Sequence, residues 1–275
     1  MAPMATQAKR AEAFLALHHG ASPLLIPNPW DLGSAKLLES LGFAALATTS
    51  GGFAATLGRL DGSVTRDEAI SHGRAIVSAV DVPVSADLEN CFADEPACVA
   101  QTVRLALDAG LAGCSVEDFS RSDDEPIYDR PLAAERVAAA AEVAHGGAVH
   151  LVLTARAENY LHGRPDLADT IARLHSYQEA GADVLFAPGV SAADDLRQLV
   201  AAVDRPVSVL ALPGTPPVAE LAEIGVRRIS VGGAFAFAAL DGLAQSAREL
   251  RDHGSYGYWD RARPGAAAAR DAFRA

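Results

Sequence analysis

Short apolar segments rich in β-branched residues alternate along the chain with longer amphipathic segments. Eight apolar segments, each bounded by Gly, Pro or Asp, begin at residues 23, 43, 82, 112, 149, 182, 205 and 226. Between them, stretches rich in Ala, Leu, Arg and Glu have helical periodicity, as over 66–80, 95–109, 132–144, 166–180, 191–202 and 216–223. The pattern predicts strands that alternate with helices.

The apolar segments are nearly continuous, as is typical of parallel strands buried on both faces. Parallel strands need helical crossovers, and eight such units close a (β/α)8 TIM barrel. A doubly wound open sheet is the alternative, but it often opens with a Gly-rich nucleotide-binding turn, which "IPNPWDLGS" does not resemble. We therefore expect an α/β protein with a single (β/α)8 barrel domain spanning 1–275.

The C-terminal segment "DHGSYGYWDRARPG" interrupts the last helical pattern before 265–274. Its Gly and Pro residues indicate a linker, and its aromatic residues indicate that it docks onto a protein surface. We expect 254–275 to form a C-terminal linker and helical extension. This extension packs either on a neighbouring subunit or within its own.

Composition narrows the class of protein. Half of the 275 residues are hydrophobic and the formal net charge is -12, which favours a folded globule and disfavours nucleic acid or anionic membranes as partners. We find neither an export signal nor an apolar run of the roughly 18 residues that a membrane span needs. Three cysteines without a CxxC pair fit a reducing cytoplasm, where we expect the protein to be located.

Acidic residues gather where the barrel strands end. Asp87 and Glu89 follow the third strand, Glu117 and Asp118 end the fourth, and Asp61 lies in the loop after the second. Neighbouring strand ends meet at the active face of such a barrel, where several carboxylates would repel one another unless a cation lay between them. Mg²⁺ suits oxygen ligands, so these acids predict a magnesium site. The alternative is that each acid caps a helix or pairs with an arginine.

Two further strand ends offer groups for an anionic ligand. Arg156 ends the fifth strand and could bind a substrate carboxylate or phosphonate, or instead pair with Glu158. The segment "TTSGG" at 48–52 ends the second strand with hydroxyls and glycines, whose backbone N–H groups could approach an anion, or it is an ordinary turn.

The lysines exclude two mechanisms. Lys9 and Lys36 are the only two, and neither is at a strand end. A Schiff-base aldolase and pyridoxal phosphate chemistry both need a lysine in the active site. A carbanion or enolate would therefore be stabilised by metal and hydrogen bonds.

With these residues assembled, the chain resembles the isocitrate lyase and phosphoenolpyruvate mutase superfamily, including its 2-methylisocitrate lyase and oxaloacetate hydrolase members. The resemblance covers about 20–240 and rests on linked motifs in the family order: "GFAALATTSGGFAATLGRLDG", "VPVSADLEN", "GCSVED", "LTARAENYL" and "GADVLF". It implies a barrel that depends on Mg²⁺, with Mn²⁺ as an alternative, and that acts on small 2-oxo or 2-hydroxy acids. It also implies a homo-oligomer, a dimer or a tetramer whose subunits exchange their last helices.

The resemblance further implies roles for the acids. Asp87 resembles the direct metal ligand, and Glu89 stands where many members have a second Asp. Asp61 and Glu117 resemble holders of metal-bound water, which makes Glu117 part of both the metal site and the catalytic site.

Substrate contacts follow in the same way. Thr49, Ser50 and Gly51 resemble the turn that holds the carboxylate and oxo oxygen of the substrate, which Asp87 reaches through the metal. Arg156 resembles the arginine that binds the far end of the substrate and acts in catalysis.

The lid segment after the fourth strand departs from the family. It reads "EDFSRSDDEPIYDR", without the Cys and His of the lyase signature or the lysine of the mutases, and it carries Asp123 and Asp124. Other proton carriers to consider are Cys91, Tyr128 and the Glu158–His162 region.

We therefore expect a magnesium-dependent lyase or hydrolase that cleaves a C–C bond in a small 2-oxo or 2-hydroxy acid through a metal-stabilised enolate. One alternative is P–C bond chemistry on phosphonopyruvate. Another is a protein of reduced catalytic ability that binds 2-oxo acids.

Overall fold

Eight parallel strands form the centre of the molecule, as the apolar segments predict. A computed structural model describes residues 6–274. Each apolar segment contains one strand: β1 Leu24–Ile26, β2 Leu46–Ala47, β3 Val84–Ala86, β4 Gly113–Glu117, β5 Val152–Arg156, β6 Val184–Phe186, β7 Val207–Leu210 and β8 Arg228–Ser230.

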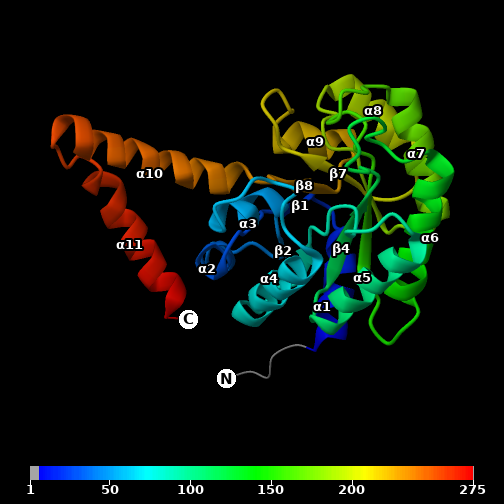
Figure 1. The fold of residues 1–275 in the computed structure, drawn as a ribbon, viewed down its shortest axis with the longest axis horizontal. Helices are drawn as coiled ribbons and strands as arrows, with labels where there is room; N and C mark the ends of the chain where they lie inside the picture. Colours follow the sequence, from blue (N-terminus) through cyan, green and yellow to red (C-terminus); the bar gives the residue numbers. More distant parts are fainter. Residues whose placement is uncertain (1–5, 275) are drawn as a thin grey trace.

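The strand order is β1-β8-β7-β6-β5-β4-β3-β2, with every pairing parallel. β1 and β2 end this order and face each other across a seam, where the Ala47 N–H donates to the Pro27 carbonyl at 3.1 Å. The sheet is thus a nearly closed (β/α)8 TIM barrel (Figure 1), and the expected fold class is confirmed.

Eleven helices accompany the strands within residues 6–274: α1 Gln7–Leu17, α2 Leu32–Ser40, α3 Ser50–Thr56, α4 Arg66–Ala79, α5 Pro96–Asp108, α6 Arg130–His145, α7 Leu167–Glu179, α8 Ala193–Ala202, α9 Val218–Ile224, α10 Ala234–His253 and α11 Trp259–Phe273. Two of these helices begin with a capping box, formed by Asp31 and Ser34 at α2 and by Thr65 and Glu68 at α4.

The core has two layers. The larger hydrophobic cluster lies between the strands and the crossover helices. A smaller cluster joins Phe14 of α1 to residues at the N-terminal ends of strands, among them Leu24, Val152 and Val184. Gly113 allows this packing, because a Cβ atom there would lie 2.7 Å from the Phe14 ring. α1 therefore closes the N-terminal end of the barrel, opposite the mouth.

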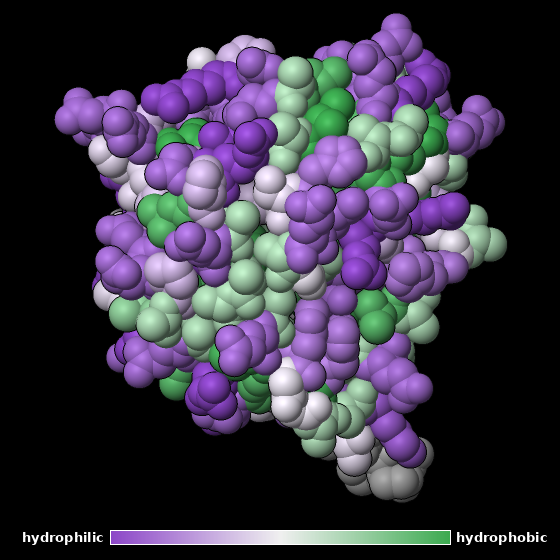
Figure 2. Space-filling model, turned by 90° about the vertical axis from the view of Figure 1, so that its right-hand side faces the viewer, coloured by the Kyte–Doolittle hydropathy of each residue, from purple (hydrophilic) through white to green (hydrophobic). Residues whose placement is uncertain are grey.

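The outer surface of the barrel is mostly polar on one side. Hydrophilic residues predominate on the side of the barrel shown in Figure 2, with hydrophobic ones scattered among them. None of the helices within residues 6–274 combines the length and apolar character that a membrane span requires.

α10 and α11 form an arm that extends away from the barrel and folds back (Figure 1). The turn between them has Gly254 at φ +61°, and Glu249 accepts hydrogen bonds from the Ser255 hydroxyl and the Gly257 N–H. The end of α11 packs on α2 of the same chain, where Ala272 is buried.

The helix of the arm begins earlier than the sequence predicts. α11 starts at Trp259 and includes Pro264, whereas the sequence places a linker up to this proline and a helix only over 265–274. Pro264 is the sixth residue of the helix, where it removes one backbone hydrogen bond, and the alanines that follow favour helix strongly.

Candidate active site at the mouth of the barrel

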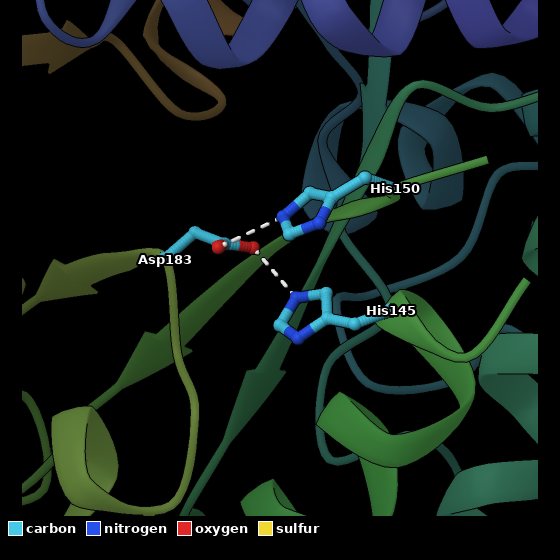
Figure 3. A group of neighbouring side chains, drawn as sticks. All are labelled: His145, His150 and Asp183. Carbon is cyan, nitrogen blue, oxygen red and sulfur yellow. Dashed lines mark hydrogen bonds and ion pairs between the residues drawn. The ribbon is translucent and has the colours of Figure 1, made fainter. Parts of the chain in front are cut away.

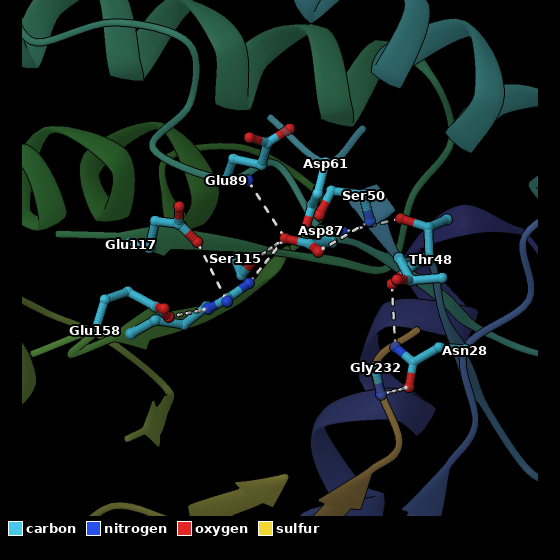
Figure 4. A network of polar contacts seen from close by, with 12 residues as sticks. Asn28, Thr48, Ser50, Asp61, Asp87, Glu89, Ser115, Glu117, Glu158 and Gly232 are labelled. Carbon is cyan, nitrogen blue, oxygen red and sulfur yellow. Dashed lines mark hydrogen bonds and ion pairs between the residues drawn. The ribbon is translucent and has the colours of Figure 1, made fainter. Parts of the chain in front are cut away.

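Asp87 lies at the centre of a polar network at the carboxyl ends of the strands (Figure 4). Its backbone N–H donates to the Thr48 hydroxyl at 2.9 Å, and its Oδ2 atom accepts a hydrogen bond from the Ser50 N–H at 3.1 Å. Its Oδ1 atom accepts one from Arg156 at 2.8 Å. Groups from the ends of β2 and β5 therefore fix the carboxylate that follows β3.

Asn28 ties the first, second and last strand ends together. Its amide donates to the Thr48 carbonyl at 3.1 Å, and its Oδ1 atom accepts from the backbone N–H groups of Val231 and Gly232 at 3.0 and 2.9 Å. Sequence reasoning missed Asn28, although an asparagine between two prolines after the first strand was a usable signal. The residue positions Thr48 and, through it, Asp87.

Arg156 is shared by three carboxylates. Its guanidinium lies 2.8 Å from Asp87 Oδ1, 3.3 Å from Glu117 Oε2 and 2.8 Å from Glu158 Oε1. Burial raises the pKa values of Glu117 and Glu158 although Arg156 opposes this. Arg156 thus forms the ion pair with Glu158 that the sequence offers as an alternative to anion binding. It also contacts Asp87 and Glu117, the acids to which the resemblance gives metal-binding and water-holding roles.

Glu89 reaches the mouth from a strained segment. Glu89, Cys91 and Phe92 have φ values of +50°, +59° and +60°, which cost free energy in residues other than glycine. One carboxylate oxygen of Glu89 pairs with Arg121 from the lid, while its buried Oε1 atom has no hydrogen-bond partner among residues 6–274. Burial, followed by the nearby Asp87 charge, raises the pKa of Glu89 to about 7.

The segment after β2 begins a helix. The Thr49 side chain accepts a hydrogen bond from the Gly52 N–H and caps α3, and the Ser50 N–H is directed at Asp87. A Cβ atom on Gly51 would lie 3.1 Å from Asp61 Oδ2, so the glycine lets Asp61 approach the mouth closely. The structure therefore brings Thr49, Ser50, Gly51 and Asp61 together with Asp87.

The three acids of the predicted metal site are each paired with an arginine. Within residues 6–274, Asp87, Glu89 and Glu117 do not bring their oxygens within 4.8 Å of one another as a set. Arg156 lies between Asp87 and Glu117, and Arg121 pairs with Glu89.

One group of side chains does have metal-ligating spacing. His145, His150 and Asp183 have ligand atoms within 4.8 Å of one another (Figure 3). His145 ends α6, His150 precedes β5 and Asp183 precedes β6, so the group lies at the N-terminal end of the barrel, away from Asp87. Both histidine Nε2 atoms lie 3.0 Å from an oxygen of Asp183, and the two rings stack in parallel. A single ion could not lie in both ring planes without one ring rotating.

The lid turns its cation inward. Arg121 points to Glu89, whereas Asp123 and Asp124 are exposed. The two acids that the lid carries therefore face solvent, while its arginine faces the mouth. The lid loop also lines a cavity of about 650 Å³ with 62–67, Asn90 and 92–94.

The candidate proton carriers differ in their surroundings. Cys91 is fully buried, and burial raises its pKa to about 12, so it does not supply a reactive thiolate. The Tyr128 hydroxyl donates to Asp94, and burial raises its pKa to about 12. His162 stacks on Phe119 with its Nε2 atom 3.9 Å from Glu158.

Comparisons with known proteins agree with this architecture. The family model for phosphoenolpyruvate phosphomutase matches residues 14–251. A crystal structure from Burkholderia cenocepacia J2315, provisionally described as a lyase/mutase, has a TM-score of 0.93 and 49% identity and covers 96% of this chain and 95% of that one. The structure of 2,3-dimethylmalate lyase has a TM-score of 0.82 and 26% identity, covering 93% and 90%.

Sequence relatives extend the comparison. An uncharacterized protein of Mycobacterium tuberculosis strain H37Rv is 34% identical over 242 residues, which are 87% of this chain and 89% of the relative. The 2-methylisocitrate lyase of Escherichia coli K12 is 28% identical over 204 residues, which are 71% of this chain and 68% of that enzyme.

Proposed function

Because the chain belongs to the phosphoenolpyruvate phosphomutase family, we propose that it is a magnesium-dependent lyase or hydrolase that cleaves a C–C bond in a small 2-oxo or 2-hydroxy carboxylic acid. Members of this superfamily are lyases and mutases that act on small carboxylic acids. The observation that carries the proposal is Asp87, held at the mouth by Ser50, Thr48 and Arg156 beside an excess of buried carboxylates.

The residues at the mouth fit a divalent cation. The buried Glu89 Oε1 atom has no partner among residues 6–274, and buried carboxylates outnumber the arginines that meet them. Mg²⁺ takes one or two carboxylates and completes its shell with waters and substrate oxygens. Asp87 would hold the ion directly, and Asp61, Glu89 and Glu117 would hold its waters. Mn²⁺ has the same ligand preferences and is the alternative.

Such an ion supplies Lewis acidity at the substrate carboxylate and the neighbouring oxygen. The chain's own side chains and backbone groups would bind and orient the substrate. Ser50 and Gly51 would place the substrate carboxylate beside Asp87, with Thr49 fixing their helix turn. Arg156 would exchange one of its carboxylate partners for the far carboxylate of the substrate, to which it can donate two parallel hydrogen bonds.

The lid favours C–C over P–C cleavage. It contains no lysine, and the cation that it directs at the mouth is Arg121, already paired with Glu89. A departing carboxylate fragment carries less charge than a phosphoryl group, so it needs fewer cations in the lid.

The test is a substrate panel with and without Mg²⁺. It includes oxaloacetate, 2-methylisocitrate, 2,3-dimethylmalate and phosphonopyruvate, with products followed by proton and phosphorus NMR. We expect one C–C acid to be cleaved only with Mg²⁺ or Mn²⁺. Conversion of phosphonopyruvate to phosphoenolpyruvate would replace this proposal with P–C chemistry, and magnesium-dependent oxalate binding without any turnover would indicate a binding protein.

We also propose that the arm formed by α10 and α11 pairs with a second copy of this chain. Exposed large apolar side chains gather on the two helices and the turn between them, among them Phe237, Leu243, Tyr256 and Trp259. Light scattering of the purified protein should give a dimer or tetramer, and Leu243→Glu should shift it toward monomer. A monomeric wild-type protein at micromolar concentration would contradict this.

A further inference from the structure

The interior of the barrel is polar where such barrels are usually filled by branched apolar side chains. Inward positions on five strands carry buried hydroxyl side chains: Ser85, Ser115, Thr154, Ser208 and Ser230. Four of them line a cavity of about 80 Å³ together with Asp87, Arg156 and Arg228. The cavity therefore extends from the mouth into the barrel.

Ser208 belongs to the same layer although it is not part of the cavity lining. Its neighbours Val207 and Val209 pack in the outer hydrophobic cluster. Because side chains alternate along a strand, Ser208 points inward. It lies directly opposite Arg228 in the β7–β8 register.

Arg228 is a buried cation with an unfilled hydrogen-bonding shell. Its side chain lies inside the barrel, and the residue is 6% exposed. Its Nη1 atom donates to the Thr154 hydroxyl at 2.9 Å. Neither Arg228 Nε nor Ser208 Oγ, both buried, has a hydrogen-bond partner among residues 6–274. Two residues that face each other in the β7–β8 pairing thus each carry a buried polar atom without a partner among the described residues.

Arg228 also lacks a contacting carboxylate among the described residues. Arg156 pairs with three carboxylates, whereas Arg228 forms no ion pair within the described part of the chain. Burial and the Arg156 charge lower the pKa of Arg228 to about 10, so it is still ionised at neutral pH. An unpaired buried charge is costly, and proteins pair such groups. The Asp87 charge acts on Arg228 without contacting it, so the guanidinium can still take a negative partner.

We propose that Arg228 and Ser208 form a buried binding site for one compact monovalent anion, either a halide or the carboxylate of a small organic acid. The guanidinium Nε–H and the Ser208 hydroxyl donate to the anion, and Thr154 holds the guanidinium in place. The carboxylate source rests on the function proposed above, because a substrate or product carboxylate would enter from the mouth. The halide source is independent of that function.

The size of the cavity supports a compact anion. One water molecule occupies about 30 Å³ of liquid, so about 80 Å³ holds two or three small groups. A halide with one water fits this volume, and so does a single carboxylate.

The first experiment locates the anion. Full-length protein is crystallised from chloride-free buffer with a bulky counter-anion, and crystals are soaked in bromide. Anomalous diffraction at the bromine edge should show a peak within hydrogen-bonding distance of Arg228 Nε. Absence of a peak there, with ordered water in its place, overturns the halide source.

The second experiment measures in solution how far anion binding stabilises the folded protein. Thermal unfolding of wild-type protein is followed in sodium bromide or sodium formate, with gluconate holding the ionic strength constant. At an anion concentration tenfold above Kd, we expect the unfolding midpoint to rise by about 3 °C. Arg228→Met should abolish the rise and Ser208→Ala should reduce it, whereas Arg251→Met, an exposed arginine, should keep it.

The outcomes separate the sources. A rise with bromide alone assigns the site to halide, a rise with formate alone assigns it to carboxylate, and mutual competition shows that both share it. No rise with either anion, or a rise that persists in Arg228→Met, overturns the site. If Arg228→Met does not fold, the weaker Ser208→Ala variant and the bromide peak still decide. Because formate is not a substrate of the proposed lyase, a failed substrate panel would leave this result standing.

Discussion

The two ends of the barrel handle buried carboxylates in opposite ways. At the N-terminal end, one carboxylate meets three donors: Asp183 accepts hydrogen bonds from His145, from His150 and from the Leu153 N–H. Burial alone would raise the pKa of Asp183, but these donors lower it below its ordinary value. The charge at this end is therefore fully satisfied by the protein.

At the mouth the ratio of donors to carboxylates is reversed, since three carboxylates share the one guanidinium of Arg156. Arg156 serves Asp87, Glu117 and Glu158, and the pKa of Glu117 is raised well above its ordinary value by burial. The difference teaches that a structural acid can be distinguished from a candidate binding acid by the number of hydrogen-bond donors that contact each carboxylate. Buried negative charge that the protein does not neutralise marks the end where a cation and a ligand would bind.

The largest effect is expected from removing Asp87, the acid at the centre of the mouth, which tests directly whether this end of the barrel is the binding end. We expect Asp87→Ala to lower magnesium-dependent kcat/KM by roughly 10³-fold, because the proposed direct ligand is lost. Turnover of whichever acid the substrate panel identifies is the measurement, and Glu135→Gln on the exposed face of α6 is the matched control. A loss of less than tenfold would remove Asp87 from the catalytic site.

Replacing Arg156, the arginine that the mouth carboxylates share, tests how much these ion pairs stabilise the protein. Arg156→Met leaves the buried Glu117 and Glu158 and the half-buried Asp87 without their common partner, so we expect a loss of about 3–5 kcal/mol in the free energy of unfolding at neutral pH. Urea denaturation measures it. Arg251→Met, which breaks an exposed pair with Asp252, should leave the free energy of unfolding almost unchanged. Equal effects of the two substitutions would contradict the distinction.

The N-terminal end should respond through pH. Asp183→Asn should cost about 1–3 kcal/mol at pH 7, because the satisfied carboxylate is lost. Since the native pKa of Asp183 lies below the unfolded value of about 3.9, its contribution is full above that value. It is lost as pH falls through the native pKa. Denaturation at pH 7, 5 and 3 should show the gap between wild type and variant narrowing only at the lowest pH, and a gap that is constant with pH would refute this.

The smallest effect is expected at the rim. Arg121 is partly exposed, so Arg121→Ala should change the free energy of unfolding by less than about 1 kcal/mol. It should nevertheless tighten Mg²⁺ binding about threefold, because a positive charge next to Glu89 is removed. Calorimetric titration with Mg²⁺ measures this, and weaker binding would show that Arg121 does not oppose the cation.

The fold was predictable because its signals are local. Near-continuous apolar runs ended by Gly, Pro or Asp specify buried parallel strands, and the order of eight such units specifies a barrel. The same logic places Asp87, Glu117 and Arg156 at one end of the sheet, as the structure shows.

The pairing of these side chains was less predictable, because it depends on which strands become neighbours and on rotamers. Sequence spacing suggests an Arg156–Glu158 pair but gives no sign that Arg156 also joins Asp87 and Glu117. Arg228 had a readable signal, since an arginine inside the strand "VRRISVGG" is unusual. Its inward direction follows only once the register with Ser208 is known.

The seam between β1 and β2 has a dynamic consequence. β2 has two residues and meets the first strand through the Ala47 N–H, whereas β4 and β5 pair over five residues. Amide hydrogens beside the seam should therefore exchange with deuterium faster than those of β4 and β5. Because β2 leads directly into Ser50 and the loop that carries Asp61, opening of the barrel at this line would loosen one wall of the mouth while the opposite wall keeps its shape.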